Sequence, residues 1–283
     1  MGSAPAPGAV FRAPAENLGR TKQCREGPLA VRQNRCPRGR GQQRPGRACS
    51  PARDFGMNTW LHLASGPTIA ARNMAVDEAL LAALPRLQRP VLRFYGWTEP
   101  AATFGYFQRY AEVSARTPLR PLIRRPTGGG IVPHAADWTY SLAFPAGHEW
   151  HRLAAVASYH RVHEWLQTAF TRLGIVTELA PCCRHTAPGA CFEGYEKSDL
   201  LWHGRKIAGA AQRRNQLGLL IQGSVQPPPV PLIRAEWEQA MLAVAREAWS
   251  VAWQPFPADP VFDEAVAALL REKYSLAEYN EKR

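Results

Sequence analysis

The feature that most restricts how this chain can fold is a run of three glycines, Gly128, Gly129 and Gly130, bracketed by arginines and a histidine. Glycine weakens the interior of helices and strands, so the run marks a loop between two ordered segments. After it, residues 138–144 alternate large apolar side chains with smaller ones, which is the period of a half-buried strand. Residues 122–124 before it also have strand character. We therefore expect the glycines at the edge of a sheet.

Such a loop could bind a ligand, because main-chain N–H groups without a neighbouring Cβ can approach an acyl or phosphate oxygen closely. Arg125 and His134 would add polar side chains at the same place. Taken alone, the glycines are equally consistent with a tight turn that binds nothing. The loop is neither a Walker P-loop nor a dinucleotide fingerprint, since no Gly-Lys-Ser/Thr follows and no G-x-G-x-x-G opens a helix.

A second glycine-flanked segment, residues 204–209, carries Lys206. The chain has five lysines against 30 arginines, so a lysine between Gly204 and Gly209 is less easily explained as a generic surface charge. A primary amine can also exchange protons where a guanidinium cannot. Although a solvated position at a strand end is the usual fate of lysine, the adjoining glycines favour a place in a pocket.

Cys191 lies in a polar loop 15 residues before Lys206. Its thiol could simply be a small buried apolar group. A nearby ammonium would instead lower the pKa of the thiol, and the thiolate so formed is a strong nucleophile. A cysteine and a lysine together suit thioester exchange, in which the thiol takes an acyl group and the lysine moves the proton. We predict that this pair is catalytic.

The charge distribution separates the first 56 residues from the rest. Residues 1–56 hold 11 Arg/Lys and 3 Asp/Glu, a net charge of +8, which leaves +4 of the chain's +12 for residues 57–283. The first segment has little apolar periodicity, so we expect a disordered extension, with Met57 as an alternative start, followed by one catalytic domain over 57–283. A net charge of +4 is too small and scattered for a nucleic-acid footprint.

The cysteines and apolar runs indicate a soluble protein of a reducing compartment. Three of the six cysteines lie in the extension, and the three that remain in the domain, Cys182, Cys183 and Cys191, are too few for a disulfide framework, so we expect a cytoplasmic protein. Cys182, Cys183 and His185 are also too crowded for the usual spacing of zinc ligands, so no metal site is expected. No apolar run reaches the length that a bilayer requires.

The periodicity of the body predicts its strands and helices. Strands are expected at 59–63, 91–95, 103–107 and 122–124, and three more at 199–202, 206–212 and 218–222 could form a meander. Gly66-Pro67 suggests a turn. Helices are expected from Asn73, which is a good N-cap, and over 151–173, 235–248 and 261–274.

Several motifs in order resemble the biotin/lipoyl protein ligase superfamily. They are Asn73 to Leu80, Phe94-Tyr95-Gly96-Trp97, Gly105-Tyr106-Phe107-Gln108, Arg124 to His134, Cys191-Phe192, Gly204 to Arg213 and the tail Lys273 to Asn280. They cover nearly all of residues 57–283, and within the superfamily the chain looks most like the cysteine-dependent, LipM-type octanoyltransferases. The resemblance implies a biotin/lipoyl ligase-type catalytic domain, which is an α/β (α+β) fold with mixed, largely antiparallel sheets flanked by helices.

The resemblance also implies a reaction that needs no cofactor. An octanoyl group would move from acyl carrier protein to a lysine of a lipoyl-domain protein, typically the glycine cleavage H protein. Cys191 would be the acyl-thioester nucleophile, and Lys206 would be its activating partner and bind the carbonyl. The substrate-binding residues would be Tyr95, Arg125, Thr127, Gly128, Gly129, Gly130, His134, Gly209 and Ala210. Several of them would line an apolar tunnel, since burial of the chain contributes about 0.8 kcal/mol per CH₂.

The chain departs from the transferase pattern at three places. The triple glycine stands where transferases have Gly-Gly-Arg, Asp199 is placed as in ATP-dependent lipoate ligases, and Gln222 replaces a histidine. A ligase that uses ATP and Mg to form lipoyl-AMP is therefore an alternative. Bacterial lipoate ligases commonly carry an accessory C-terminal domain, however, and only about 59 residues follow Ser224. A non-catalytic protein that binds lipoyl domains or lipoate is a third alternative.

Overall fold

The computed structural model describes residues 58–184 and 194–282. Its strands are β1 (Asn58–Thr68), β2 (Val91–Trp97), β3 (Ala101–Phe104), β4 (Leu122–Arg124), β5 (Val132–His134), β6 (Trp138–Pro145), β7 (Glu178–Leu179), β8 (Leu200–Trp202), β9 (Arg205–Arg214), β10 (Gly218–Val225) and β11 (Val251–Pro255). Its helices are α1 (Ala70–Leu87), α2 (Tyr110–Arg116), α3 (Glu149–Arg152), α4 (Ala155–Arg172), α5 (Arg234–Trp249), α6 (Pro260–Leu269), a π-helical turn (Leu270–Tyr274) and α7 (Ala277–Asn280). The predicted extension, residues 1–56, and Cys191 lie outside the described residues.

Eight strands form one mixed sheet in the order β11-β1-β2-β6-β10-β9-β8-β7. Strand β1 runs parallel to β11 and to β2, and every other pairing in this sheet is antiparallel. Strands β8, β9 and β10 are the predicted meander. The predicted α/β fold with a largely antiparallel sheet is therefore confirmed.

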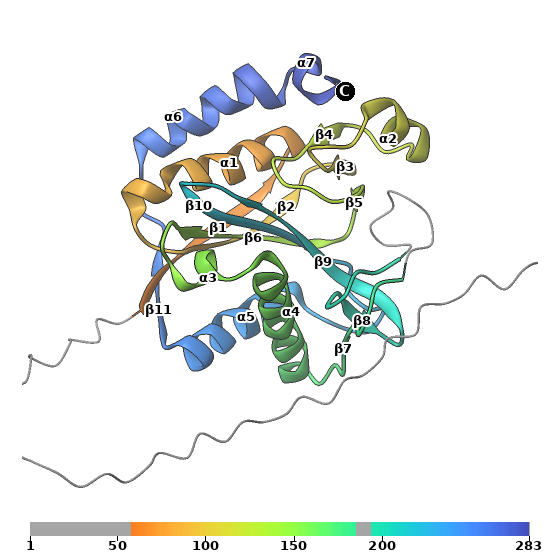
Figure 1. Ribbon diagram of the computed structural model, residues 1–283, viewed down its shortest axis with the longest axis vertical. Coiled ribbons are helices and arrows are strands. Elements are labelled where there is room, and N and C mark those ends of the chain that lie inside the picture. Colours follow the sequence, from red (N-terminus) through yellow and green to blue (C-terminus); the bar gives the residue numbers. More distant parts are fainter. Residues whose placement is uncertain (1–57, 185–193, 283) are drawn as a thin grey trace, which may run out of the picture. The chain divides into compact units, whose positions relative to one another are not determined.

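Helices cover both faces of this sheet (Figure 1). Helices α1 and α6 pack on one face, and α3, α4 and α5 lie on the other. Strand β10 supplies both cores, because Leu220 joins the α1 side while Leu219 and Ile221 join the α4 and α5 side. All eight residues of β6 are buried, so the predicted half-buried strand is wrong. The large apolar side chains of β6 point to one face of the sheet and the smaller ones to the other, and both faces are buried because helices cover them.

A second sheet of three short strands, in the order β4-β3-β5, carries the glycine loop between β4 and β5. The C-terminal residues tie this sheet to the rest of the fold through Arg124, which is fully buried. Its guanidinium donates hydrogen bonds to the carbonyl oxygens of Tyr106, Gln108, Tyr279 and Asn280. Arg124 is therefore a structural residue whose donors bind main chain.

The start of one predicted helix and one predicted turn differ from the structure. Helix α1 begins at Ala70 instead of Asn73, because the Asn73 amide donates to the Gly96 carbonyl oxygen at 2.8 Å rather than capping the helix. Gly66 and Pro67 lie within β1, near a register shift to β2. Pro67 is tolerated there because β11 pairs only with Asn58–His62, which leaves one side of the strand unpaired at the proline.

The predicted helix over 151–173 is two helices, α3 and α4, separated by Leu153 and Ala154 in extended conformation. The strand predicted to end at Phe107 ends at Phe104. Strand β11 and helix α2 were not predicted. Both are short elements, for which a period is difficult to recognise in sequence.

Candidate functional site

One cavity collects most of the residues that the sequence singles out. Its lining includes Tyr95, Arg125, Gly129, His134, Lys206, Gly209 and Ala210 from the predicted set, together with Met74, Thr103, Val132, Thr139, Ala211, Gln222, Gly223 and Ser224. The cavity therefore joins the small sheet and its glycine loop to strands β9 and β10. Gly128 and Gly130 contribute carbonyl oxygens to the same loop, and Thr127 contacts the lining residue Gln222.

Lys206 is nearly buried and is paired with a buried carboxylate. Its Nζ lies 2.7 Å from Oδ2 of Asp199, and the side chains are 7% and 0% exposed. The same Oδ2 accepts a hydrogen bond from the backbone N–H of Glu196 at 2.7 Å, and Oδ1 accepts one from the Tyr159 hydroxyl. Burial, followed by the negative charge of Asp199, raises the pKa of Tyr159 well above its ordinary value, so Tyr159 stays a donor. The arrangement holds the Lys206 amine against Asp199 at the cavity lining.

Gly209 makes room for this ion pair. A Cβ on Gly209 would lie 2.6 Å from Cε and 2.8 Å from Nζ of Lys206, and 3.2 Å from Oδ1 of Asp199. The absence of a Cβ on Gly209 therefore lets another group approach this strand closely. The group that approaches is the lysine of the same strand.

The glycine loop is folded around Arg125. The guanidinium donates to the carbonyl oxygens of Gly128 and Gly130, at 2.5 Å and 2.8 Å for Nη2. Gly129 has φ of +88°, in the region that favours glycine, and its carbonyl oxygen lies only 2.0 Å from where a Cβ on Gly105 would be. The run is thus a tight turn packed against the end of β3, as well as part of the cavity lining.

A chain of hydrogen bonds passes through His134. Its Nδ1 lies 2.8 Å from Oδ2 of Asp137, and its Nε2 lies 2.8 Å from Oγ1 of Thr103. Because the carboxylate accepts a hydrogen bond from Nδ1–H, Nε2 is the acceptor and the Thr103 hydroxyl is the donor. The indole of Trp97 stacks on the imidazole with ring centroids 3.8 Å apart. His134 is therefore held in one orientation and one tautomer.

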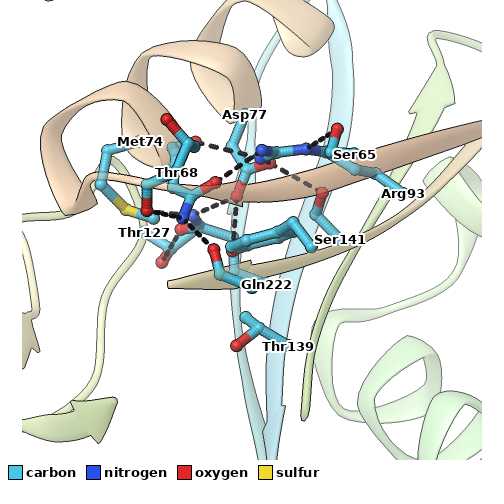
Figure 2. A network of polar contacts seen from close by, with 12 residues as sticks. Ser65, Thr68, Met74, Asp77, Arg93, Thr127, Thr139, Ser141 and Gln222 are labelled. Carbon is cyan, nitrogen blue, oxygen red and sulfur yellow. Dashed lines mark hydrogen bonds and ion pairs between the residues drawn. The ribbon is translucent and has the colours of Figure 1, made fainter. Parts of the chain in front are cut away.

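A second polar network lies behind the cavity wall (Figure 2). Asp77 and Arg93 form an ion pair at 2.7 Å, and both side chains are fully buried. Asp77 also accepts hydrogen bonds from the Tyr95 hydroxyl at 3.0 Å and from the Gln222 amide at 2.7 Å. Burial and then the negative charge of Asp77 raise the pKa of Tyr95 well above its ordinary value.

Sequence reasoning did not assign Asp77, Arg93, Thr103, Asp137 or Gln222 to the site. One signal was present, because Arg93 interrupts the apolar strand from Val91 to Tyr95 and a charge there must find a buried partner. The hydroxyl of Thr103 and the carboxylate of Asp137 gave no comparable signal. Cys191 lies outside the described residues, so its role stays a prediction.

The described parts of the chain hold no group of three or more His, Cys, Asp or Glu side chains that could bind a metal ion. Within the same ranges, no helix combines the length and apolar character that crossing a membrane requires.

The architecture is that of lipoate-ligase catalytic domains. Protein Ta0514 of T. acidophilum, solved with bound lipoic acid, superposes with a TM-score of 0.67 at 21% identity and covers 80% of this chain and 100% of its own. Lipoate-protein ligase A bound with ATP gives a TM-score of 0.65 at 20% identity over 80% of this chain and 99% of its own. At these identities the similarity concerns the fold alone.

The sequence matches the family more directly. The profile of the lipoyl protein ligase A/B catalytic domain matches residues 70–226, more than half of the chain. The chain belongs to this family.

Two curated relatives extend the match. An octanoyltransferase LipM of Carboxydothermus hydrogenoformans is 36% identical over 175 residues, which are 60% of this chain and 65% of the relative. One from Kyrpidia tusciae is 34% identical over 221 residues, 73% of this chain and 74% of the relative. The chain thus spans slightly less than two thirds of the length of the first. The predicted resemblance to the ligase superfamily and to LipM-type proteins is confirmed.

Proposed function

We propose that this protein is an octanoyltransferase of protein lipoylation, which moves an octanoyl group from acyl carrier protein to a lysine of a lipoyl-domain protein. The observation that carries the proposal is the Lys206 ammonium, nearly buried against Asp199 and lining a cavity formed with the glycine loop. Relatives named octanoyltransferase LipM, at 32–36% identity, support the choice of reaction. The acceptor class also agrees with a related fold solved as a lipoate protein ligase with its E2 lipoyl domain.

The reaction would take place in two balanced steps. The Cys191 thiolate attacks the carbonyl carbon of the octanoyl thioester, the carbon–sulfur bond to the carrier breaks, and the carrier thiolate leaves and takes a proton. The neutral amine of the acceptor lysine then attacks the Cys191 thioester, an amide forms, and the Cys191 sulfur leaves. The amine loses one proton in this step, and the leaving Cys191 thiolate takes it up, which regenerates the thiol. Neither step consumes ATP or involves a change of oxidation state.

Lys206 would act mainly through its charge. An ammonium stabilises a neighbouring thiolate and the oxyanion that forms when the carbonyl is attacked. Because Asp199 holds the Lys206 amine at the cavity lining, Lys206 would bind the carbonyl oxygen first and carry a proton second. This refines the predicted role of a proton shuttle.

The alternative of an ATP-dependent lipoate ligase is supported by two features of the sequence, the triple glycine and the position of Asp199 before the turn that precedes Lys206. In that case Lys206 would contact an acyl-adenylate, with ATP and Mg as co-substrates. A third outcome is a protein that binds lipoyl domains or lipoate without catalysis.

One experiment separates the three. The protein is incubated with octanoyl-acyl carrier protein in the absence of ATP, and its intact mass is measured before and after hydroxylamine. An octanoyl adduct that hydroxylamine removes supports the transferase, provided that it is lost in Cys191→Ala and kept in the matched Cys183→Ala variant. Acylation of a lipoyl domain by free lipoate only with ATP would identify the ligase. If no acyl group is transferred under either condition, the third alternative remains, a protein that binds lipoyl domains or lipoate without catalysis.

A further inference from the structure

Five polar side chains of the cavity lining direct hydrogen bonds to two carboxylates that are not part of the lining. His134, Thr139 and Ser224 bind Asp137, and Tyr95 and Gln222 bind Asp77. The two aspartates are 4% and 0% exposed. Five of the polar residues that line the cavity therefore have hydrogens bound behind the wall, while Lys206 pairs with Asp199 and Arg125 donates to carbonyl oxygens of the glycine loop.

The Asp137 carboxylate binds three donors through a single oxygen. Oδ2 accepts from His134 Nδ1 at 2.8 Å, from Thr139 Oγ1 at 2.9 Å and from Ser224 Oγ at 2.7 Å. An anionic oxygen accepts several short hydrogen bonds, which a neutral acceptor does less well. Two of these donors also accept hydrogen bonds, Thr139 Oγ1 from the Trp97 indole and His134 Nε2 from Thr103. The other oxygen of Asp137, Oδ1, is buried and has no hydrogen-bond partner within the described residues.

Asp77 also accepts hydrogen bonds from side chains of the cavity lining through a single oxygen. Its Oδ2 accepts from Tyr95 and Gln222, while Arg93 neutralises its charge through Oδ1. The carbonyl oxygen of the Gln222 side chain accepts in turn from Thr127 at 2.6 Å. Gln222 thus offers the cavity mainly the carbon atoms of its side chain.

We propose that Asp77 and Asp137 are positioning residues that set the acyl selectivity of the cavity. Because the two aspartates bind polar hydrogens of the lining side chains, these side chains present mainly carbon atoms to an unsubstituted alkyl chain. A polar substituent on the acyl chain then finds few hydrogen-bond partners. An acyl chain with a terminal hydroxyl is then rejected, because the hydroxyl loses water without gaining a partner. The inference rests on the proposed function for the identity of the acyl group, but concerns only the cavity.

The test compares the binding of octanoic acid and 8-hydroxyoctanoic acid by calorimetry. The wild-type protein is expected to prefer octanoic acid. Asp137→Ala leaves three donors of the lining without their acceptor, so the ratio of the two dissociation constants should fall about tenfold toward the hydroxylated acid, the effect of one buried polar group gaining a partner. Asp137→Asn keeps an acceptor oxygen but loses the negative charge, so it should restore part of the preference and leave the ratio about twofold to threefold below the wild-type value. Asp263→Ala, an exposed aspartate of α6, is the matched control and should leave the ratio unchanged.

Equal binding of the two acids by the wild-type protein would overturn the proposal. The proposal would also be overturned if the Asp137→Ala variant is folded, as one cooperative melting transition would show, and the ratio of the two dissociation constants is unchanged. If that variant does not fold, Asp137→Asn provides the same test with a smaller shift, and an unchanged ratio there would count against the proposal. Because free acids are used, a protein that binds octanoic acid selectively but transfers no octanoyl group would refute the proposed function and leave the selectivity intact.

Discussion

The ion pair between Lys206 and Asp199 is not explained by its contribution to folding stability. A buried ion pair loses hydration on both partners, and its net contribution to folding is often close to zero. Removing one partner is costly, because the other charge stays buried and unpaired. A lysine kept in such a place, lining a cavity and with a glycine beside it to make room, is better explained by its chemistry than by folding.

Gly209→Ala tests this at the level of one methyl group. The new Cβ would lie 2.6 Å from Lys206 Cε, so the amine must leave Asp199 or shift within the cavity. The lysine side chain is flexible, and we expect the free energy of unfolding to fall by about 1 kcal/mol. Octanoyl transfer should fall at least tenfold, as measured by intact mass of the acceptor. Gly66→Ala, where an added Cβ meets no atom within 4 Å, is the matched control and should keep full activity. Equal activity in the two variants would contradict the assigned role of Gly209.

Among the elements, the sequence predicted those whose period was long or clearly bounded. Strands β4, β9 and β10 and helices α5 and α6 lie where periodicity and glycine turns placed them. Helix α1 was misplaced at its start, because Asn73 was assigned a local capping role and instead makes a tertiary hydrogen bond to Gly96. The same limit applies to the site. Lys206 and the glycine loop are local signals, whereas Asp77 and Gln222, 145 residues apart, meet only after the sheet has formed.

Helix α4 contains a buried histidine, His163, which makes the stability of the fold depend on pH. His163 is fully buried, its Nδ1 lies 2.8 Å from the Tyr159 carbonyl oxygen, and its Nε2 has no hydrogen-bond partner within residues 58–184 and 194–282. Burial lowers the pKa of His163 to about 4 from its ordinary value of 6.5. The unfolded chain therefore binds more protons between pH 6.5 and pH 4. Stability from the neutral imidazole is complete above pH 6.5 and is lost as the pH falls toward 4.

When the pH falls from 7 to 5, we expect the free energy of unfolding to decrease by about 2 kcal/mol more in the wild-type protein than in His163→Phe. The figure follows from a loss of about 1.4 kcal/mol for each pH unit below 6.5. Phenylalanine fills a similar volume and does not titrate. Urea unfolding of both proteins at the two pH values measures the difference. The carboxylates respond to acid in both proteins, so the comparison isolates the histidine. Parallel pH dependence in the two proteins would show that burial of His163 does not limit stability in acid.

At the scale of the whole molecule, the last residues act on the cavity through Arg124. Asn280 accepts a hydrogen bond from the Arg124 backbone N–H at 2.9 Å, although 156 residues separate them. Its amide donates to the carbonyl oxygens of Tyr274 and Leu276, each at 3.0 Å. Arg124 is followed directly by Arg125, whose guanidinium folds the glycine loop. The C-terminal turn thus supports the loop without being part of the cavity lining.

Asn280→Ala should therefore affect both stability and substrate binding. It removes three hydrogen bonds and leaves a buried N–H of Arg124 without its acceptor, so we expect a loss of about 2–3 kcal/mol in the free energy of unfolding, measured in urea. Displacement of β4 should loosen the glycine loop and raise KM for the octanoyl donor more than it lowers kcat, since the reacting groups are untouched. The exposed neighbour Glu281→Ala is the matched control and should change neither quantity. If Asn280→Ala loses stability but keeps the wild-type KM, the C-terminal turn holds the fold together without positioning the loop.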